Sequence, residues 1–114
     1  MIKLLVTSHG EGEYISYTLS GHAMYGEYGQ DIVCAAVSVL ALATLNYITE
    51  IFQLDGFVEY EIKDGYMKVE LQDLGISKDQ REIFHKLVAG LVINMESIAS
   101  QYPDSLKLEF RRIE

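Results

Sequence analysis

The sequence has one cysteine and one proline, and it lacks tryptophan altogether. A single cysteine excludes a disulfide within the chain, so we expect an intracellular protein whose thiol is reduced. Basic residues are also scarce, because 9 Lys and Arg stand against 17 Asp and Glu, for a net charge of −8. Nucleic-acid backbones and anionic membranes attract basic surfaces, so we expect no direct nucleic-acid partner and no membrane partner. A positively charged peptide is a partner that suits this charge.

The chain also lacks a hydrophobic run long enough to cross a bilayer. The longest run, IVCAAVSVLALATL, covers only residues 32–45, whereas a spanning helix needs roughly 20 apolar residues. The first residues, MIKLLVTSHG, show no secretion-signal pattern. We therefore expect a core helix in this region and a cytoplasmic protein. No linker or repeat interrupts the sequence, which predicts a single domain over residues 1–114.

Two stretches alternate apolar and polar residues around turns. IKLLVTS and EYISYTLS flank Gly10 and Gly12 and predict a first hairpin. The stretch FVEYEIKDGYMKVELQ, residues 57–72, predicts a second hairpin, because Asp64-Gly65 is a favoured two-residue turn.

The Asp64-Gly65 turn also fixes the pairing of its two strands. One face of the hairpin then carries apolar pairs, so we expect one buried face and one solvated face. The same register sets Glu59 opposite Glu70, a like-charge pair that only an exposed edge tolerates. The apolar pairs are Ile62 with Met67, Tyr60 with Val69, and Val58 with Leu71.

Two helices are expected between these strands. The first runs from about Ile32 to about Phe52 and is apolar nearly all round, so it must be covered on more than one side. The second follows Ser77, which matches a capping box with Gln80, and Pro103 closes it.

The tail SLKLEFRRI alternates again and predicts a last strand. The order is ββαββαβ, which predicts an α+β fold with a mostly antiparallel sheet and two helices packed on one face. Because one sheet and one amphipathic helix leave part of the first helix uncovered, we also expect a homodimer.

The stretch GHAMYGEYGQDIVCAAVS, residues 21–38, contains a histidine, three glycines and the only thiol. Asp31 precedes the apolar run and is a preferred helix N-cap. Cys34 would then lie in the first turn, where free N–H groups favour a thiolate and can hold an oxyanion. His22 is close enough in sequence to fold back on the sulfur as a base.

Residue chemistry alone leaves alternatives open. A lone cysteine in an apolar helix is usually a small core residue, and the glycines could simply form turns. Asp31 either caps the helix, which its spacing favours, or orients His22 as the third member of a triad. Ser38 lies one turn after Cys34, and it either hydrogen-bonds within the site or bonds back to the Cys34 carbonyl.

The same stretch resembles the signature of the ribosomal-processing cysteine proteases of Firmicutes and related bacteria, the Prp family. That signature runs Gly-His-Ala, a short glycine-containing loop, Gly-x-Asp-Ile-Val-Cys-Ala and a nearby serine. The matching residues here are Gly21, His22, Ala23, Gly29, Asp31, Ile32, Val33, Cys34, Ala35 and Ser38.

The resemblance implies a cysteine endopeptidase with a catalytic pair of Cys34 and His22, supported by Gly21, Asp31 and Ser38. It implies a flexible loop over residues 23–30, in which Gly26 and Gly29 allow movement, and a dimeric protein. The implied substrate is the short, basic N-terminal extension of the twenty-seventh protein of the large ribosomal subunit. That extension is cut after an aromatic residue during ribosome assembly.

Two other functions compete with a protease. A thiol redox sensor would use Cys34 without cleaving anything, although the chain has no second thiol to resolve it. A non-catalytic ribosome-assembly module would only hold the ribosomal-protein tail. We expect no metal and no cofactor, because His9, His22 and Cys34 would need a further zinc ligand and no CxxC or HExxH spacing exists.

Overall fold

The computed structural model describes residues 1–21 and 28–113, with the backbone alone for residues 28–31. Its elements follow the predicted order. They are β1 (Ile2–His9), β2 (Glu13–Ser20), α1 (Tyr28–Asn46), a π-helical turn (Tyr47–Ile51), a 3₁₀ turn (Asp55–Phe57), β3 (Val58–Lys63), β4 (Tyr66–Leu71), α2 (Lys78–Gln101) and β5 (Leu106–Ile113).

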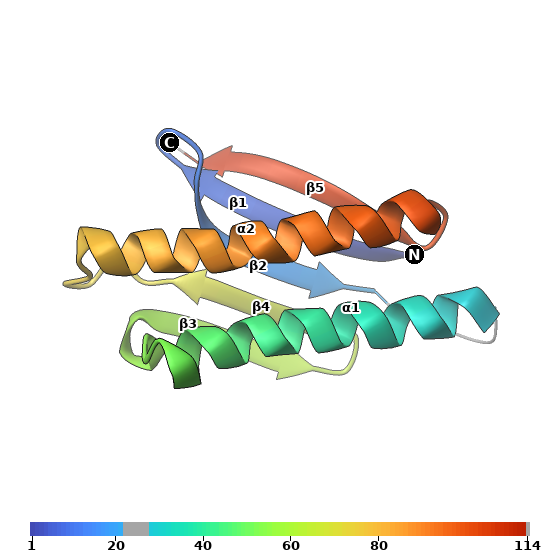
Figure 1. The fold of residues 1–114 in the computed structure, drawn as a ribbon, viewed down its shortest axis with the longest axis horizontal. Coiled ribbons are helices and arrows are strands. Elements are labelled where there is room, and N and C mark those ends of the chain that lie inside the picture. Colours follow the sequence, from blue (N-terminus) through green and yellow to red (C-terminus); the bar gives the residue numbers. More distant parts are fainter. Residues whose placement is uncertain (22–27, 114) are drawn as a thin grey trace.

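The five strands form one sheet in the order β3-β4-β2-β1-β5. All neighbours are antiparallel except β1 and β5, which run parallel with Ile2 opposite Leu106. Both helices lie on the same face of the sheet (Figure 1). The expected α+β fold is therefore confirmed.

Helix α1 begins earlier than its apolar run. It starts at Tyr28, and its α-helical part ends at Asn46, where the π-helical turn carries the chain on to Ile51. The predicted start near Ile32 is wrong, since the helix has a further turn before it. Local sequence preferences do not indicate that turn, because Gly29 and its polar neighbours favour a loop. The predicted end near Phe52 agrees with the structure, since the Phe52 N–H donates to the Tyr47 carbonyl at 2.9 Å.

Helix α1 buries only one of its faces. The buried side includes Val33, Val37, Ala41 and Leu45, and the Tyr17 hydroxyl of β2 donates to the Ala41 carbonyl at 2.9 Å. The opposite side leaves an apolar stripe in solvent. That stripe, called the outer stripe below, consists of Ile32, Ala35, Val39 and Leu42.

Helix α2 begins with the predicted capping box. Ser77 Oγ accepts the Gln80 N–H at 3.1 Å, and Gln80 Oε1 accepts the Ser77 N–H at 2.9 Å. The helix ends at Gln101, two residues before Pro103. Its buried residues are Phe84, Val88, Leu91, Val92 and Met95.

By length and composition, the described part of the chain has two helical segments that could cross a bilayer, Ile32–Ile51 and Lys78–Gln101. The core helices of soluble proteins meet the same criterion. Both segments here pack against the sheet, and their buried side chains belong to its core.

The β3–β4 hairpin has the predicted register, with Ile62 opposite Met67 and Glu59 opposite Glu70. The expected buried face is confirmed for Met67 and Val69 of β4. On β3, Val58 alone is buried. Strand β3 is the edge of the sheet, so its apolar side chains have neighbours on one side only.

Candidate active site

A cavity of about 310 Å³ separates the first half of α1 from the tip of the β3–β4 hairpin. Cys34, the free thiol, lines it from the helix and is partly buried. Ile2, Leu19 and Gly21 line it from the ends of β1 and β2. The only thiol of the chain therefore faces an open space with apolar lining.

The position of Cys34 within α1 differs from the prediction. Because the helix begins at Tyr28, Asp31 lies inside the helix and is not its N-cap. The N–H groups near residues 33–35 are paired with carbonyls four residues earlier, so they cannot form the expected oxyanion site. Cys34 lies in the second turn, where the anion-favouring effect of a helix N-terminus has already weakened.

The predicted loop over residues 23–30 is wrong for its last three residues. Residues 28–30 belong to α1, and Gly29 is a helical residue. Gly26 and His22 lie outside the described residues, as does the side chain of Asp31.

Gly21 is fixed at the rim of the cavity. Its φ is +96°, and a Cβ at this position would collide with the Met1 carbonyl oxygen. The Gly21 N–H donates to the Gly65 carbonyl at 3.0 Å, which ties the end of β2 to the hairpin turn. The residue that follows Gly21 in the chain is His22, so the chain leaves the sheet beside the cavity that Cys34 lines.

Ser38 lies one turn after Cys34 and lines the same cavity. Other hydroxyls on this helix and the turn that follows it, those of Thr44 and Thr49, donate to the carbonyls four residues earlier. Within the described part of the chain, the Ser38 hydroxyl makes no such bond to the Cys34 carbonyl. It is therefore available to a group that enters the cavity.

The hairpin tip forms the wall opposite α1, and the sequence does not predict this role. Ile62 and Met67 supply apolar surface, and the tip residues 63–66 also line the cavity. Lys63 Nζ lies 5.3 Å from the centroid of the Tyr66 ring and 3.1 Å from Glu61 Oε2. No sequence signal points to this wall, because it arises only when the edge of the sheet folds next to α1.

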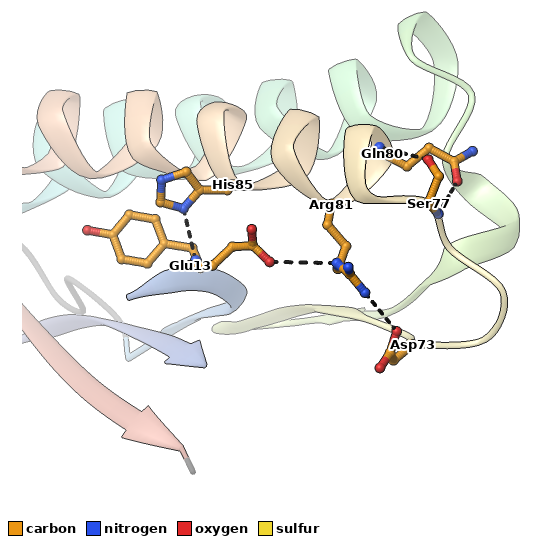
Figure 2. Close-up of polar contacts among 7 residues, drawn as sticks. Glu13, Asp73, Ser77, Gln80, Arg81 and His85 are labelled. Carbon is orange, nitrogen blue, oxygen red and sulfur yellow. Dashed lines mark hydrogen bonds and ion pairs between the residues drawn. The ribbon is translucent and has the colours of Figure 1, made fainter. Parts of the chain in front are cut away.

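A second polar cluster lies at the other end of the sheet, where α2 begins (Figures 1 and 2). Arg81 lies 3.8 Å from Glu13 and 3.5 Å from Asp73, and His85 Nδ1 accepts the Tyr14 N–H at 2.9 Å. A hollow of about 510 Å³ adjoins this cluster. As far as the structure describes its lining, the hollow contains no thiol or hydroxyl. These contacts hold the first hairpin against α2, a structural role.

Among the side chains of residues 1–21 and 32–113, there is no group of three or more His, Cys, Asp or Glu that could hold a metal ion.

A thiol that lines an open cavity is what a cysteine hydrolase requires of its nucleophile. The family model described as Cysteine protease Prp matches residues 1–107, so the chain belongs to that family and is a cysteine protease.

Curated relatives carry the name Ribosomal processing cysteine protease Prp. The protein of Bacillus subtilis is 27% identical over 89% of this chain and 88% of its own length. That of Mycoplasma pneumoniae is 29% identical over 98% of this chain and 97% of its own length.

Solved structures share the fold. The chain SMU.848 from Streptococcus mutans superposes with a TM-score of 0.76 at 29% identity, over 99% of this chain and 96% of that one. The Prp of S. aureus, crystallised with a covalently linked product peptide, gives a TM-score of 0.75 at 24% identity. That comparison covers 97% of this chain and 100% of the S. aureus chain.

Proposed function

We propose that this protease removes the short N-terminal extension of the twenty-seventh large-subunit ribosomal protein, cutting after an aromatic residue, in the cytoplasm. The observation that carries the proposal is the cavity shared by Cys34, Ser38 and Gly21, the residue before His22. Leu19, Ile62 and Met67 give this cavity an apolar lining that suits an aromatic side chain. Relatives named for ribosomal processing, and the substrate-peptide complex of the S. aureus protein, support a peptide substrate.

The proposed mechanism uses Cys34 and His22 as a catalytic pair. His22 takes the thiol proton, and the Cys34 sulfur attacks the carbonyl carbon of the aromatic residue. The C–N bond then breaks, and His22 returns its proton to the leaving amine. Water attacks the resulting thioester with His22 as base, which releases the carboxylate and restores the thiol.

Ser38 is proposed to donate its hydroxyl hydrogen to the substrate in this cavity. It faces the same space as the sulfur and, within the described residues, has no competing bond to the helix backbone. This role replaces the oxyanion site that the sequence predicts at the N–H groups of residues 33–35.

The test is mass spectrometry of a synthetic extension peptide incubated with the wild type, with Cys34→Ala and with Cys34→Ser. We expect a single cut after the aromatic residue by the wild type and no cut by either variant, with unchanged unfolding curves. An intact peptide that binds all three proteins tightly would instead indicate a non-catalytic assembly module. An intact peptide without binding, together with reversible oxidation of Cys34, would indicate a redox sensor.

We also propose that the protein is a homodimer that buries the outer stripe of α1. Ile32, Val39 and Leu42 in this stripe are 47%, 66% and 43% exposed. A contiguous apolar stripe on a helix is a common site of association between protein chains.

A further inference from the structure

Strand β3 (Val58–Lys63) offers a free edge next to the cavity of Cys34. It is the outermost strand of the sheet, and every residue after Val58 is exposed. Unpaired backbone groups on such an edge are a template for another extended chain. At the hairpin end, Ile62 and Lys63 line the same cavity as Cys34.

The hairpin register determines which backbone groups of β3 are free. In a two-residue hairpin, the residues that flank the turn exchange hydrogen bonds, and pairs along the strands then alternate. Residues 59, 61 and 63 therefore direct their N–H and C=O groups toward β4. The Gln72 N–H, which donates to the Phe57 carbonyl at 2.7 Å, fits this alternation. Tyr60 and Ile62 consequently direct their N–H and C=O groups outward.

The side chains on this edge also suit an extended peptide. Tyr60 and Ile62 are 56% and 51% exposed, on the face of the sheet that carries the helices. They are two residues apart, which is the spacing at which an added strand presents side chains to one face. An added strand would therefore find both backbone partners and apolar contacts here.

The charge on the other face of this edge favours a basic peptide. A hollow of about 190 Å³ is lined by Glu59, Glu61, Lys68 and Glu70, which lie on this face, and by Tyr60 of the edge strand. The negative charge of Glu61 is compensated by two lysines, because Glu61 lies opposite Lys68 and its Oε2 is 3.1 Å from Lys63 Nζ. Glu59 and Glu70 lie opposite each other. Within the described residues, neither has a cation within ion-pair distance.

We propose that the free edge of β3 binds the peptide substrate as a sixth strand, with Glu59 and Glu70 facing its basic side chains. The peptide then extends from this edge into the cavity, where its scissile bond meets Cys34. The inference deepens the proposed function and rests on it. It assigns a binding surface outside the catalytic cavity to a basic, extended peptide.

Binding is measured on the Cys34→Ala background, so that the peptide stays intact whether or not the wild type cleaves it. We expect the double variant Glu59→Gln/Glu70→Gln to bind a labelled basic extension peptide about tenfold more weakly at low salt. The difference should shrink at about 1 M salt, where the screening length falls to about 3 Å. The control Glu11→Gln/Glu96→Gln makes the same change in net charge at exposed sites elsewhere, and should bind like the parent.

Strand addition is tested separately with peptides that are N-methylated at one backbone position each. Methylation at alternate positions should weaken binding strongly and methylation between them weakly, because only every second N–H faces β3. Equal effects at all positions, or unchanged binding by Glu59→Gln/Glu70→Gln, would overturn the proposal.

A third measurement tests whether the β3 edge binds a peptide or is instead the contact between two copies of the chain. Tyr60→Lys should leave the sedimentation coefficient unchanged, and conversion of a dimer to a monomer would assign the edge to a second copy instead. Failure of the wild type to cut the peptide would refute the proposed function, yet the binding results would still decide whether the edge holds a basic strand.

Discussion

Gly21 is constrained both by its own backbone and by a neighbouring chain segment. Its φ of +96° strains any side chain, and Met1 occupies the space that a Cβ would need. Met1 cannot move away freely, because the next N–H, that of Ile2, donates to the Ser105 carbonyl at 2.9 Å. The residue before His22 is thus held by the start of β1, which is itself bonded to the residue that precedes β5.

Replacing Gly21 by alanine should destabilise the protein by about 2–4 kcal/mol, from backbone strain and the collision together. Gly12→Ala is a matched control, since Gly12 has φ +103° and no atom lies within 4 Å of where its Cβ would stand. That control should cost only the strain, about 1 kcal/mol. Urea unfolding of both variants checks the difference. Equal losses of unfolding free energy would mean that Met1 moves away from the added methyl group.

Ser38 provides a second prediction at the scale of one residue. Ser38→Ala should lower kcat for the extension peptide about tenfold, the effect of one hydrogen bond of about 1.4 kcal/mol, with little change in stability. Ser97→Ala is the control, because Ser97 donates to its own helix at the Ile93 carbonyl and lies on α2. Steady-state kinetics that show the same kcat for both variants would remove Ser38 from the site.

Sequence reasoning predicts some of these residues and misses others for physical reasons. Cys34 and Ser38 are four residues apart on a helix, so a shared cavity follows from helical geometry alone. The sequence predicts Asp31 at the helix start, because it precedes the apolar run and is a preferred N-cap residue. The structure places Asp31 inside α1, further along the helix than local sequence preferences indicate.

Among the elements, the β3–β4 hairpin separates what local sequence determines from what packing determines. Its register follows from a two-residue turn and agrees with the structure at every pair. The burial of its side chains cannot be predicted from the turn, because the exposure of Tyr60 depends on where the helices lie across the sheet. The same limit explains why the sequence does not predict the hairpin tip as a wall of the site.

Tyr17 joins β2 to α1 and makes this connection sensitive to alkali. Burial raises the pKa of Tyr17 well above the ordinary value of about 10. The unfolded chain therefore loses this proton first as the pH rises. The contribution of Tyr17 to the free energy of unfolding is therefore fully present below about pH 10. Above that pH it falls by about 1.4 kcal/mol per pH unit.

Tyr17→Phe should remove this alkaline slope and cost about 1 kcal/mol at neutral pH, from the lost bond to the Ala41 carbonyl. Tyr60→Phe, on the exposed edge, should keep the slope. Unfolding free energies measured between about pH 8 and 11 check both variants. A slope that persists in Tyr17→Phe would assign the alkaline loss to another group.

For the whole molecule, the outer stripe of α1 is the feature that predicts assembly. Val39 lies within this stripe and is 66% exposed. Val39→Glu should convert a dimer to a monomer, because a buried unpaired carboxylate is costly at an apolar contact. Leu74→Glu, at a residue that is 78% exposed near the start of α2, should remain dimeric. Sedimentation at micromolar concentration checks both, and a monomeric wild type would end the proposal.

The parallel pairing of β1 with β5 has a consequence for the timing of synthesis. Residue 2 pairs with residue 106, so β1 gains its second neighbouring strand, β5, only after almost the whole described chain has been synthesised. Until then the nascent sheet has an open flank, and closure of so distant a contact is intrinsically slow. Ile2 is also part of the lining beside Cys34. The cavity wall that β1 supplies therefore gains its second neighbouring strand only when the last described strand has been synthesised.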